Sequence, residues 1–157
     1  NVKVAMHKNI RYGTLAAILR LPTYYKEEKW VEEKAEELLK EVGLYSLRNE
    51  LATNLPYGKQ RRLEIARVLA IQPRILYLDE PAAGMNPQET KELTELIDHI
   101  REKYKLTVIL IEHDMSLVMK ICERIYVLNY GKMIANGTPE EIKQNEFVVK
   151  AYLGEEI

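Results

Sequence analysis

The segment from Arg74 to Pro81 carries a strong chemical signal, because two adjacent acids, Asp79 and Glu80, directly follow the apolar run Ile75–Leu78. Such a run predicts a strand buried on both faces, with the acids at its carboxyl end, where open α/β sheets bind ligands. An aspartate there can hold Mg²⁺ through retained water molecules, and a neighbouring glutamate can deprotonate an attacking water. Taken alone, the pattern is equally that of a strand that ends before a turn.

A second apolar run, from Leu106 to Ile111, ends at Glu112-His113-Asp114. If it forms a neighbouring parallel strand, His113 and Glu80 lie at the same edge of the sheet. An imidazole at that edge can donate a hydrogen bond to a phosphate oxygen or to a charged intermediate. His99 lacks such a setting, and we expect it to be a surface residue of an amphipathic helix.

A third candidate is the segment Leu55–Arg67, in which Gly58 lies at the predicted start of a helix. Exposed backbone N–H groups and the helix dipole make such an end suitable for a phosphate. Four cations lie on or beside it: Lys59, Arg61, Arg62 and Arg67. The alternative interpretation is a basic solvent-exposed face in which Glu64 pairs with arginines.

Two groups of elements must position these residues. Up to residue 72 the pattern is helical, with a broken helix over 1–23 and longer helices over 24–43 and from Tyr57 to Pro73. From residue 73 onwards strands alternate with helices, which predicts βαβ units and a parallel sheet. We therefore expect a helical subdomain over 1–72 and an α/β portion over 73–157.

Local signals mark several boundaries within the α/β portion. Asn86-Pro87-Gln88-Glu89 supplies an N-cap, a proline at the first helical position and a glutamate at the third. Thr138-Pro139-Glu140-Glu141 repeats this pattern at a second helix start. Asn129-Tyr130-Gly131-Lys132 predicts the turn of a hairpin.

Composition excludes several classes of protein. The 157 residues include 23 Lys plus Arg and 24 Asp plus Glu, with 46% apolar residues, which fits neither a disordered chain nor a general polyanion binder. A single cysteine, Cys122, excludes an internal disulfide framework and favours a reducing compartment. The apolar runs are far shorter than the roughly 20 residues that a membrane span needs. Because the sequence opens at Asn1 without a methionine, we expect a processed, excised or partial chain.

Taken together and in this order, these segments resemble the ATP-binding subunit of ABC transporters. Leu55–Arg61 resembles the signature motif of that family, Ile75–Glu80 the Walker B strand, Ala82–Asn86 the D-loop and His113 the switch histidine. Further segments resemble the LivG-type group of branched-chain amino acid importers. They are Asn1–His7, Leu63–Arg67, Glu80–Pro87, Ile111–Met115, Ala135–Ile142 and Ala151–Gly154. The resemblance covers essentially the whole chain.

The chain departs from the family pattern in two respects. It contains no GxxxxGK motif followed by Ser or Thr, so the Walker A loop, which cradles phosphates with backbone N–H groups, is missing. The signature segment has Pro56, Tyr57 and Lys59 where the general family pattern has serine, glycine and glutamine. Pro56 cannot supply the hydroxyl contact of that serine. Lys59 either contacts the phosphate or points to solvent.

The resemblance implies a fold class and a function. The expected fold is α/β, a P-loop NTPase-like parallel sheet with a helical signature subdomain, lacking the Walker A half. The chain then resembles the carboxyl-terminal part of an ATPase subunit that couples ATP hydrolysis to amino acid uptake. In that family, Asp79 positions Mg²⁺, Glu80 is the general base and His113 senses the γ-phosphate. The signature residues then face the ATP of a second subunit; here they are Pro56, Tyr57, Gly58, Lys59 and Gln60.

The implied partners are a second ATPase subunit, identical or different, and two transmembrane permease subunits, with a solute-binding protein acting indirectly. The implied location is peripheral, at the cytoplasmic face of the cell membrane. A DNA-repair or chromosome ATPase shares the signature and Walker B order. It is disfavoured because no heptad run separates the two motifs and the near-zero charge offers no footprint for nucleic acid. A non-catalytic fragment that docks on membrane subunits is the other alternative, and residues 1–157 alone are expected to be inactive.

Overall fold

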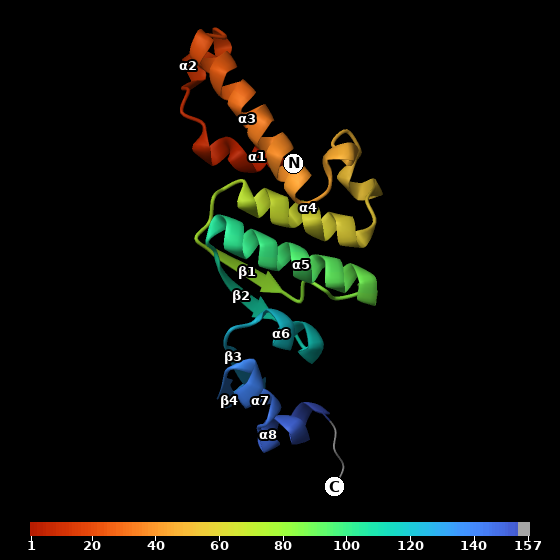
Figure 1. Ribbon diagram of the computed structural model, residues 1–157. Helices are drawn as coiled ribbons and strands as arrows, with labels where there is room; N and C mark the ends of the chain where they lie inside the picture. Colours follow the sequence, from red (N-terminus) through yellow and green to blue (C-terminus); the bar gives the residue numbers. More distant parts are fainter. Residues whose placement is uncertain (154–157) are drawn as a thin grey trace. The chain divides into compact units, whose positions relative to one another are not determined.

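A computed structural model describes residues 1–153 of the chain (Figure 1). These residues form two compact units. Unit 1 comprises Asn1–Tyr77 and Ala83–Ile109, and unit 2 comprises Leu78–Ala82 and, among the described residues, 110–153. Two strands, β1 (Ile75–Asp79) and β2 (Thr107–Ile111), therefore begin in unit 1 and end in unit 2. The expected boundary between residues 72 and 73 stays a prediction.

Unit 1 is mainly helical and contains the starts of β1 and β2. Its helices are α1 (Val2–Ala5), η1 (Met6–Asn9), α2 (Thr14–Ile18), α3 (Pro22–Glu41), η2 (Tyr45–Leu47), η3 (Ala52–Asn54), α4 (Tyr57–Leu69) and α5 (Pro87–Tyr104). The broken helix expected over residues 1–23 is thus three short helices. Within residues 1–153, no helix has both the length and the apolar character needed to cross a membrane.

The core of unit 1 lies along the apolar faces of its three long helices. In α5, Leu93, Ile97 and Ile100 are fully buried at spacings of three and four residues, as one face of an α-helix requires. In α4, Ile65 and Leu69 are buried at the same spacing. The start of α5 is fixed by the predicted capping box, in which the Asn86 side chain accepts from the Glu89 N–H and the Glu89 carboxylate accepts from the Asn86 N–H.

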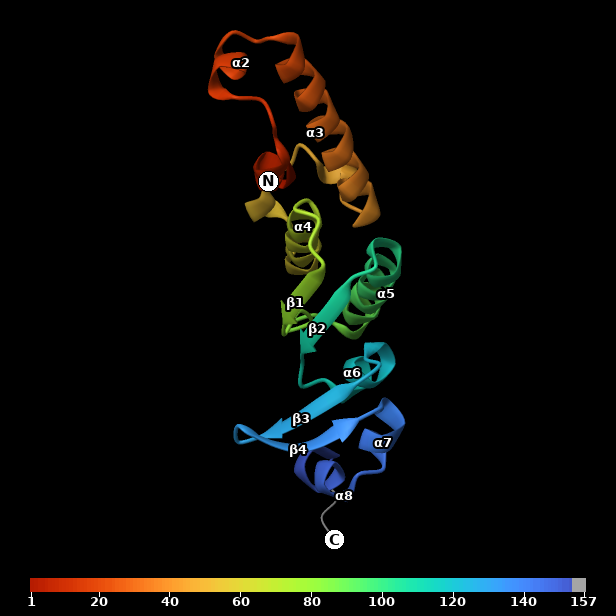
Figure 2. The ribbon, with the colours of Figure 1, turned by 90° about the vertical axis from the view of Figure 1, so that its left-hand side faces the viewer.

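The strands β1 and β2 pair in parallel, as the sequence predicts. At one end the Thr107 N–H donates to the Arg74 carbonyl over 3.0 Å, and at the other the Glu80 N–H donates to the Ile111 carbonyl over 2.9 Å. The prediction that β1 is buried on both faces is wrong, because Leu76 is buried whereas Tyr77 is exposed. The helix α5 covers one face of this pair (Figure 2), so only alternate residues are buried.

Unit 2 is built on the antiparallel hairpin of β3 (Ile125–Asn129) and β4 (Lys132–Gly137). Its two-residue turn, Tyr130-Gly131, has positive φ angles of 46° and 74°, as a type I′ hairpin turn requires. Around the hairpin lie α6 (Met115–Ile121), α7 (Pro139–Lys143), α8 (Glu146–Val148) and the π-helix η4 (Val149–Leu153). The core of the unit consists of Val118, Ile125, Val127, Ile142 and Val148. The predicted capping box at Thr138 is confirmed.

In the described part of the chain, the two strand pairs form two separate sheets, β1-β2 and β3-β4.

An ion cluster at Glu41 joins the ends of α3 and α5 within unit 1. The carboxylate is 10% exposed, lies 2.5 Å from His99 Nε2 and accepts a hydrogen bond from Lys103 Nζ. Burial would raise the pKa of Glu41, but the hydrogen bonds from Lys103 and His99 outweigh it and hold that pKa below its ordinary value. His99 is exposed, as predicted, but it contributes to the packing of two helices.

Glu41→Gln is expected to lower the free energy of unfolding by about 1.5–3 kcal/mol at neutral pH, because it removes the charge from a buried, hydrogen-bonded carboxylate. A group with a lowered folded-state pKa stabilises the protein above its unfolded pKa and loses that effect as pH falls through the folded pKa. The difference in the free energy of unfolding between Glu41→Gln and wild type should therefore become smaller below about pH 4.

Urea unfolding followed by circular dichroism at several pH values measures this difference. The matched control is Glu33→Gln, which breaks an exposed pair with Lys29 at 3.7 Å and should change stability by less than about 1 kcal/mol. An effect of Glu41→Gln that is no larger than the control, or that does not depend on pH, would contradict the role of this cluster.

Candidate functional site

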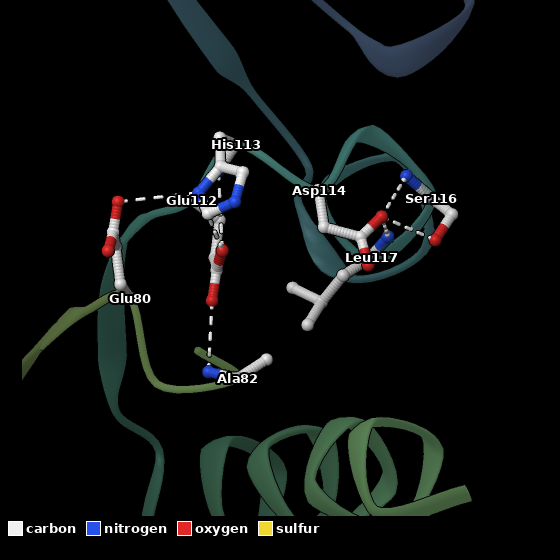
Figure 3. A network of polar contacts seen from close by, with 7 residues as sticks. All are labelled: Glu80, Ala82, Glu112, His113, Asp114, Ser116 and Leu117. Carbon is white, nitrogen blue, oxygen red and sulfur yellow. Dashed lines mark hydrogen bonds and ion pairs between the residues drawn. The ribbon is translucent and has the colours of Figure 1, made fainter. Parts of the chain in front are cut away.

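Glu80 and His113 meet at the carboxyl ends of β1 and β2 (Figure 3). Glu80 Oε1 lies 3.3 Å from His113 Nδ1, and both side chains are more than half exposed. The parallel pairing explains this meeting, because the two strands end side by side and each is followed within two residues by the functional side chain. The two residues that the sequence identified as candidate catalytic groups are therefore in direct contact.

The backbone at Glu80 adopts the left-handed conformation, with φ of 43°. Its N–H still donates to the Ile111 carbonyl at the edge of β2. This conformation turns the chain sharply as β1 ends. A non-glycine residue in this region costs on the order of 1–2 kcal/mol, and such strain is characteristic of functional sites.

Glu112 organises the backbone around the pair. Its side chain is 2% exposed, its Oε1 accepts from the Ala82 N–H over 3.0 Å, and its Oε2 accepts from the His113 N–H over 3.3 Å. It thereby ties the segment that follows Glu80 to the segment that carries His113. Its role is not predicted from the sequence. The signal present in the sequence is an acid directly after the apolar run that ends at Ile111, and an acid that is buried at such a place must be hydrogen-bonded to be stable.

Asp114 fixes the chain directly after His113 by capping α6. Its Oδ1 accepts from the Ser116 hydroxyl over 2.6 Å and from the Ser116 N–H over 2.9 Å. The hydrogen bonds from Ser116 hold the pKa of Asp114 below its ordinary value. His113 is thus held between a strand end and a capped helix start.

Asp79 is the last residue of β1 and is exposed. Within residues 1–153, no three His, Cys, Asp or Glu side chains converge into a ready-made metal cage. This arrangement fits Mg²⁺, which usually keeps several waters and takes only one or two protein carboxylates. The single exposed carboxylate of Asp79 is thus accessible to such an ion.

The signature segment lies at the start of α4, in unit 1. The Gln60 side chain donates to the Leu55 carbonyl over 2.8 Å, so it closes the turn that leads into the helix. A side chain at Gly58 would bring its Cβ to 3.2 Å from Glu89 Oε1, and that carboxylate belongs to the capping box of α5. The absence of a side chain at Gly58 therefore lets α4 approach the start of α5.

Tyr57 and Lys59 project from the same helix start. The Tyr57 hydroxyl accepts from Arg61 Nε over 3.0 Å and from its terminal nitrogen over 2.6 Å, while Arg61 also pairs with Glu64 at 2.7 Å. The hydrogen bonds from Arg61 to Glu64 and Tyr57 raise the pKa of the guanidinium. The predicted pairing of Glu64 with an arginine is thereby confirmed. Lys59 and Pro56 are exposed.

The structure thus places the predicted site residues in two groups. Asp79, Glu80 and His113 lie together in unit 2, and Pro56–Gln60 lie together in unit 1. Each group is organised by local contacts of its own.

Comparison with known proteins identifies the family. The profile of the ABC transporter family matches residues 3–83, and that of the branched-chain amino acid ATP-binding cassette transporters matches residues 132–157. The crystal structure of the ADP conformation of MJ1267, an ATP-binding cassette of an ABC transporter, matches 98% of this chain with a TM-score of 0.74 and 26% identity. The match covers 61% of that structure. The chain belongs to the ABC transporter ATP-binding family.

Within that family, the chain is similar to ATPases named for branched-chain amino acid transport. It is 51% identical over 155 residues to the high-affinity branched-chain amino acid transport ATP-binding protein LivG of Salmonella typhimurium. It is 49% identical over the same length to BraF of Pseudomonas aeruginosa. Both matches cover 99% of this chain, and the chain spans 61% of the length of each relative. The resemblance inferred from the sequence is thereby confirmed.

Proposed function

We propose that these residues form the Walker B, switch and signature part of an ATPase subunit that couples ATP hydrolysis to the uptake of branched-chain amino acids. The contact of Glu80 with His113 at the end of a parallel strand pair supports this proposal most directly. The identity of 51% to LivG supports the choice of transported solute.

Three residues at the strand ends have different roles in ATP hydrolysis. Asp79 holds Mg²⁺, which supplies charge neutralisation on the nucleotide phosphates. Glu80 accepts the proton of the attacking water, and its exposed carboxylate is accessible to that water. His113, whose Nδ1 lies 3.3 Å from Glu80 Oε1, orients this carboxylate and donates to the γ-phosphate. Glu112 positions the segments that carry Glu80 and His113, because it accepts hydrogen bonds from the backbone N–H groups of Ala82 and His113.

The signature residues serve a different nucleotide. Pro56–Gln60 face the ATP held by a second ATPase subunit, identical or different, so that two subunits enclose the nucleotides between them. The exposed ammonium of Lys59 strengthens the phosphate contact at the start of α4. Gln60 keeps the helix start in the required conformation through its hydrogen bond to the Leu55 carbonyl, and Gly58 leaves room for the Glu89 carboxylate.

Two transmembrane permease subunits complete the proposed assembly, and a solute-binding protein delivers the amino acid to them. The ATPase then lies at the cytoplasmic face of the membrane as a peripheral subunit. Closure of the ATPase dimer drives the permeases through the helical subdomain.

A chimera tests the proposed activity. It joins the Walker A segment of Salmonella typhimurium LivG to the amino end of residues 1–157, in the order that the family uses. We expect this chimera to release phosphate from Mg-ATP, measured by a coupled assay, at a rate comparable to that of LivG itself. The matched control carries alanine in place of the Walker A lysine. A folded chimera without activity above this control would contradict the assignment of residues 79, 80 and 113.

A further inference from the structure

An apolar tip lies at one end of unit 1, where α2 leads into the start of α3 (Figure 1). We define the tip as residues 14–25. Leu15 and Ile18 are each 74% exposed, and Leu19 is 65% exposed. Leu21 and Tyr25 are also exposed on the same short segment. Exposed apolar side chains gathered in this way mark an interaction surface rather than scattered surface positions.

The tip is held in a defined conformation. The Arg11 N–H donates to Glu27 Oε2 over 2.7 Å, and the Tyr12 hydroxyl donates to Glu28 Oε1 over 2.7 Å. The Tyr12 ring also packs edge-on against Tyr24 at 5.2 Å. The hydrogen bond to Glu28 raises the pKa of Tyr12 to about 12, so this tie persists through the neutral range. The apolar residues are thus presented by a segment that is fastened to α3.

The charge around the tip is predominantly positive. All 24 acidic residues of the chain follow Lys26, whereas the first 26 residues contain five Lys and Arg. Arg11, Arg20 and Lys26 are exposed and flank the apolar residues. The nearest acids, Glu27 and Glu28, lie at the base of the tip, where they accept hydrogen bonds from the Arg11 backbone N–H and the Tyr12 hydroxyl. The tip therefore combines exposed leucine, isoleucine and tyrosine with a basic rim.

We propose that this tip docks on the surface of an anionic lipid bilayer. Apolar side chains that enter the headgroup region, flanked by Lys and Arg that meet anionic lipids, are the two components of interfacial membrane binding. Tyrosine at the rim suits the boundary between headgroups and acyl chains. The interaction gives the ATPase a membrane contact of its own, besides the permeases, and it does not depend on nucleotide.

Co-sedimentation of the 157-residue chain with lipid vesicles tests this proposal. The probes are vesicles of phosphatidylcholine alone and vesicles with about 30% phosphatidylglycerol. We expect binding to the anionic vesicles, weaker binding to the neutral ones, and a loss as salt rises from about 0.1 M to about 0.5 M. The double variant Leu15→Ser/Ile18→Ser should bind at least about tenfold more weakly. Arg20→Glu/Lys26→Glu should weaken binding only to the anionic vesicles.

Matched controls separate the tip from general surface effects. Leu51→Ser/Phe147→Ser removes two equally exposed apolar side chains elsewhere, and Lys91→Glu/Lys132→Glu reverses two exposed charges elsewhere. Both controls should bind within about twofold of wild type. Circular dichroism verifies that each variant is folded.

Three results would overturn the proposal. They are absence of binding to anionic vesicles, binding that the tip variants leave unchanged, and a concentration-dependent dimer in light scattering that Leu15→Ser/Ile18→Ser abolishes. The last result would assign the tip to a second copy of the chain.

Discussion

Glu80→Gln is expected to lower the turnover of Mg-ATP by about 10²–10⁴-fold in the chimera with the LivG Walker A segment, while ATP binding persists. Glutamine keeps the shape of the side chain and the left-handed backbone at residue 80, but it lacks the basic oxygen. A steady-state phosphate-release assay gives kcat, and equilibrium binding of a fluorescent ATP analogue gives the affinity.

The matched control for this variant is Glu140→Gln, which neutralises an exposed acid on α7 in the same unit. Its turnover should be that of the parent chimera. Turnover by Glu80→Gln within about threefold of the control would contradict the assignment of Glu80 as the base, since loss of a general base costs far more. A parallel loss of binding and turnover would indicate a structural role for Glu80 instead.

Residues 1–157 alone are expected neither to bind Mg-ATP tightly nor to hydrolyse it. The sequence contains no GxxxxGK motif, so it offers no loop of backbone N–H groups to hold the phosphates. No bound triphosphate is then available to supply further ligands to Mg²⁺ beside Asp79 and Glu80. Single exposed carboxylates bind the ion weakly. Isothermal titration calorimetry with Mg-ATP should give no saturable heat up to about 1 mM nucleotide.

The chimera provides the positive control in the same calorimeter. One-to-one binding by residues 1–157 with a micromolar dissociation constant would contradict this prediction and would relocate the nucleotide site. If the chimera binds and the chain alone does not, the signature and Walker B residues are insufficient without the phosphate loop. That outcome would also favour a part of an ATPase over the alternative, a non-catalytic fragment that only docks on membrane subunits.

Sequence reasoning identified the elements with local signals. The capping boxes at Asn86 and Thr138 and the Tyr130-Gly131 turn depend on residues within four positions of one another, so they are legible without tertiary structure. The strands that end at Asp79 and Ile111 were recognisable from their apolar runs. Their parallel pairing followed from the helical segment between them, and it brought Glu80 to His113 as predicted.

Features that depend on partners far away in the sequence could not be predicted in this way. The pairing of Glu41 with His99 joins residues 58 positions apart, and helical periodicity shows only which face each occupies. The burial of Glu112 depends on the Ala82 N–H, 30 positions earlier in the chain. The exposure of Tyr77 depends on which layers cover the sheet, and an apolar run does not reveal that. The assignment of Pro56–Gln60 to a nucleotide of another subunit remains a prediction.

At Glu80, the residue that would best stabilise the left-handed backbone differs from the residue that activity requires. Selection for thermostability alone would favour glycine there, because glycine adopts a φ of 43° without the penalty that a side chain incurs. That replacement would discard the carboxylate at the same time. Directed evolution of a more heat-resistant subunit should therefore be screened for turnover as well as for folding, since the variant that gains most at this turn is also the one that loses the base.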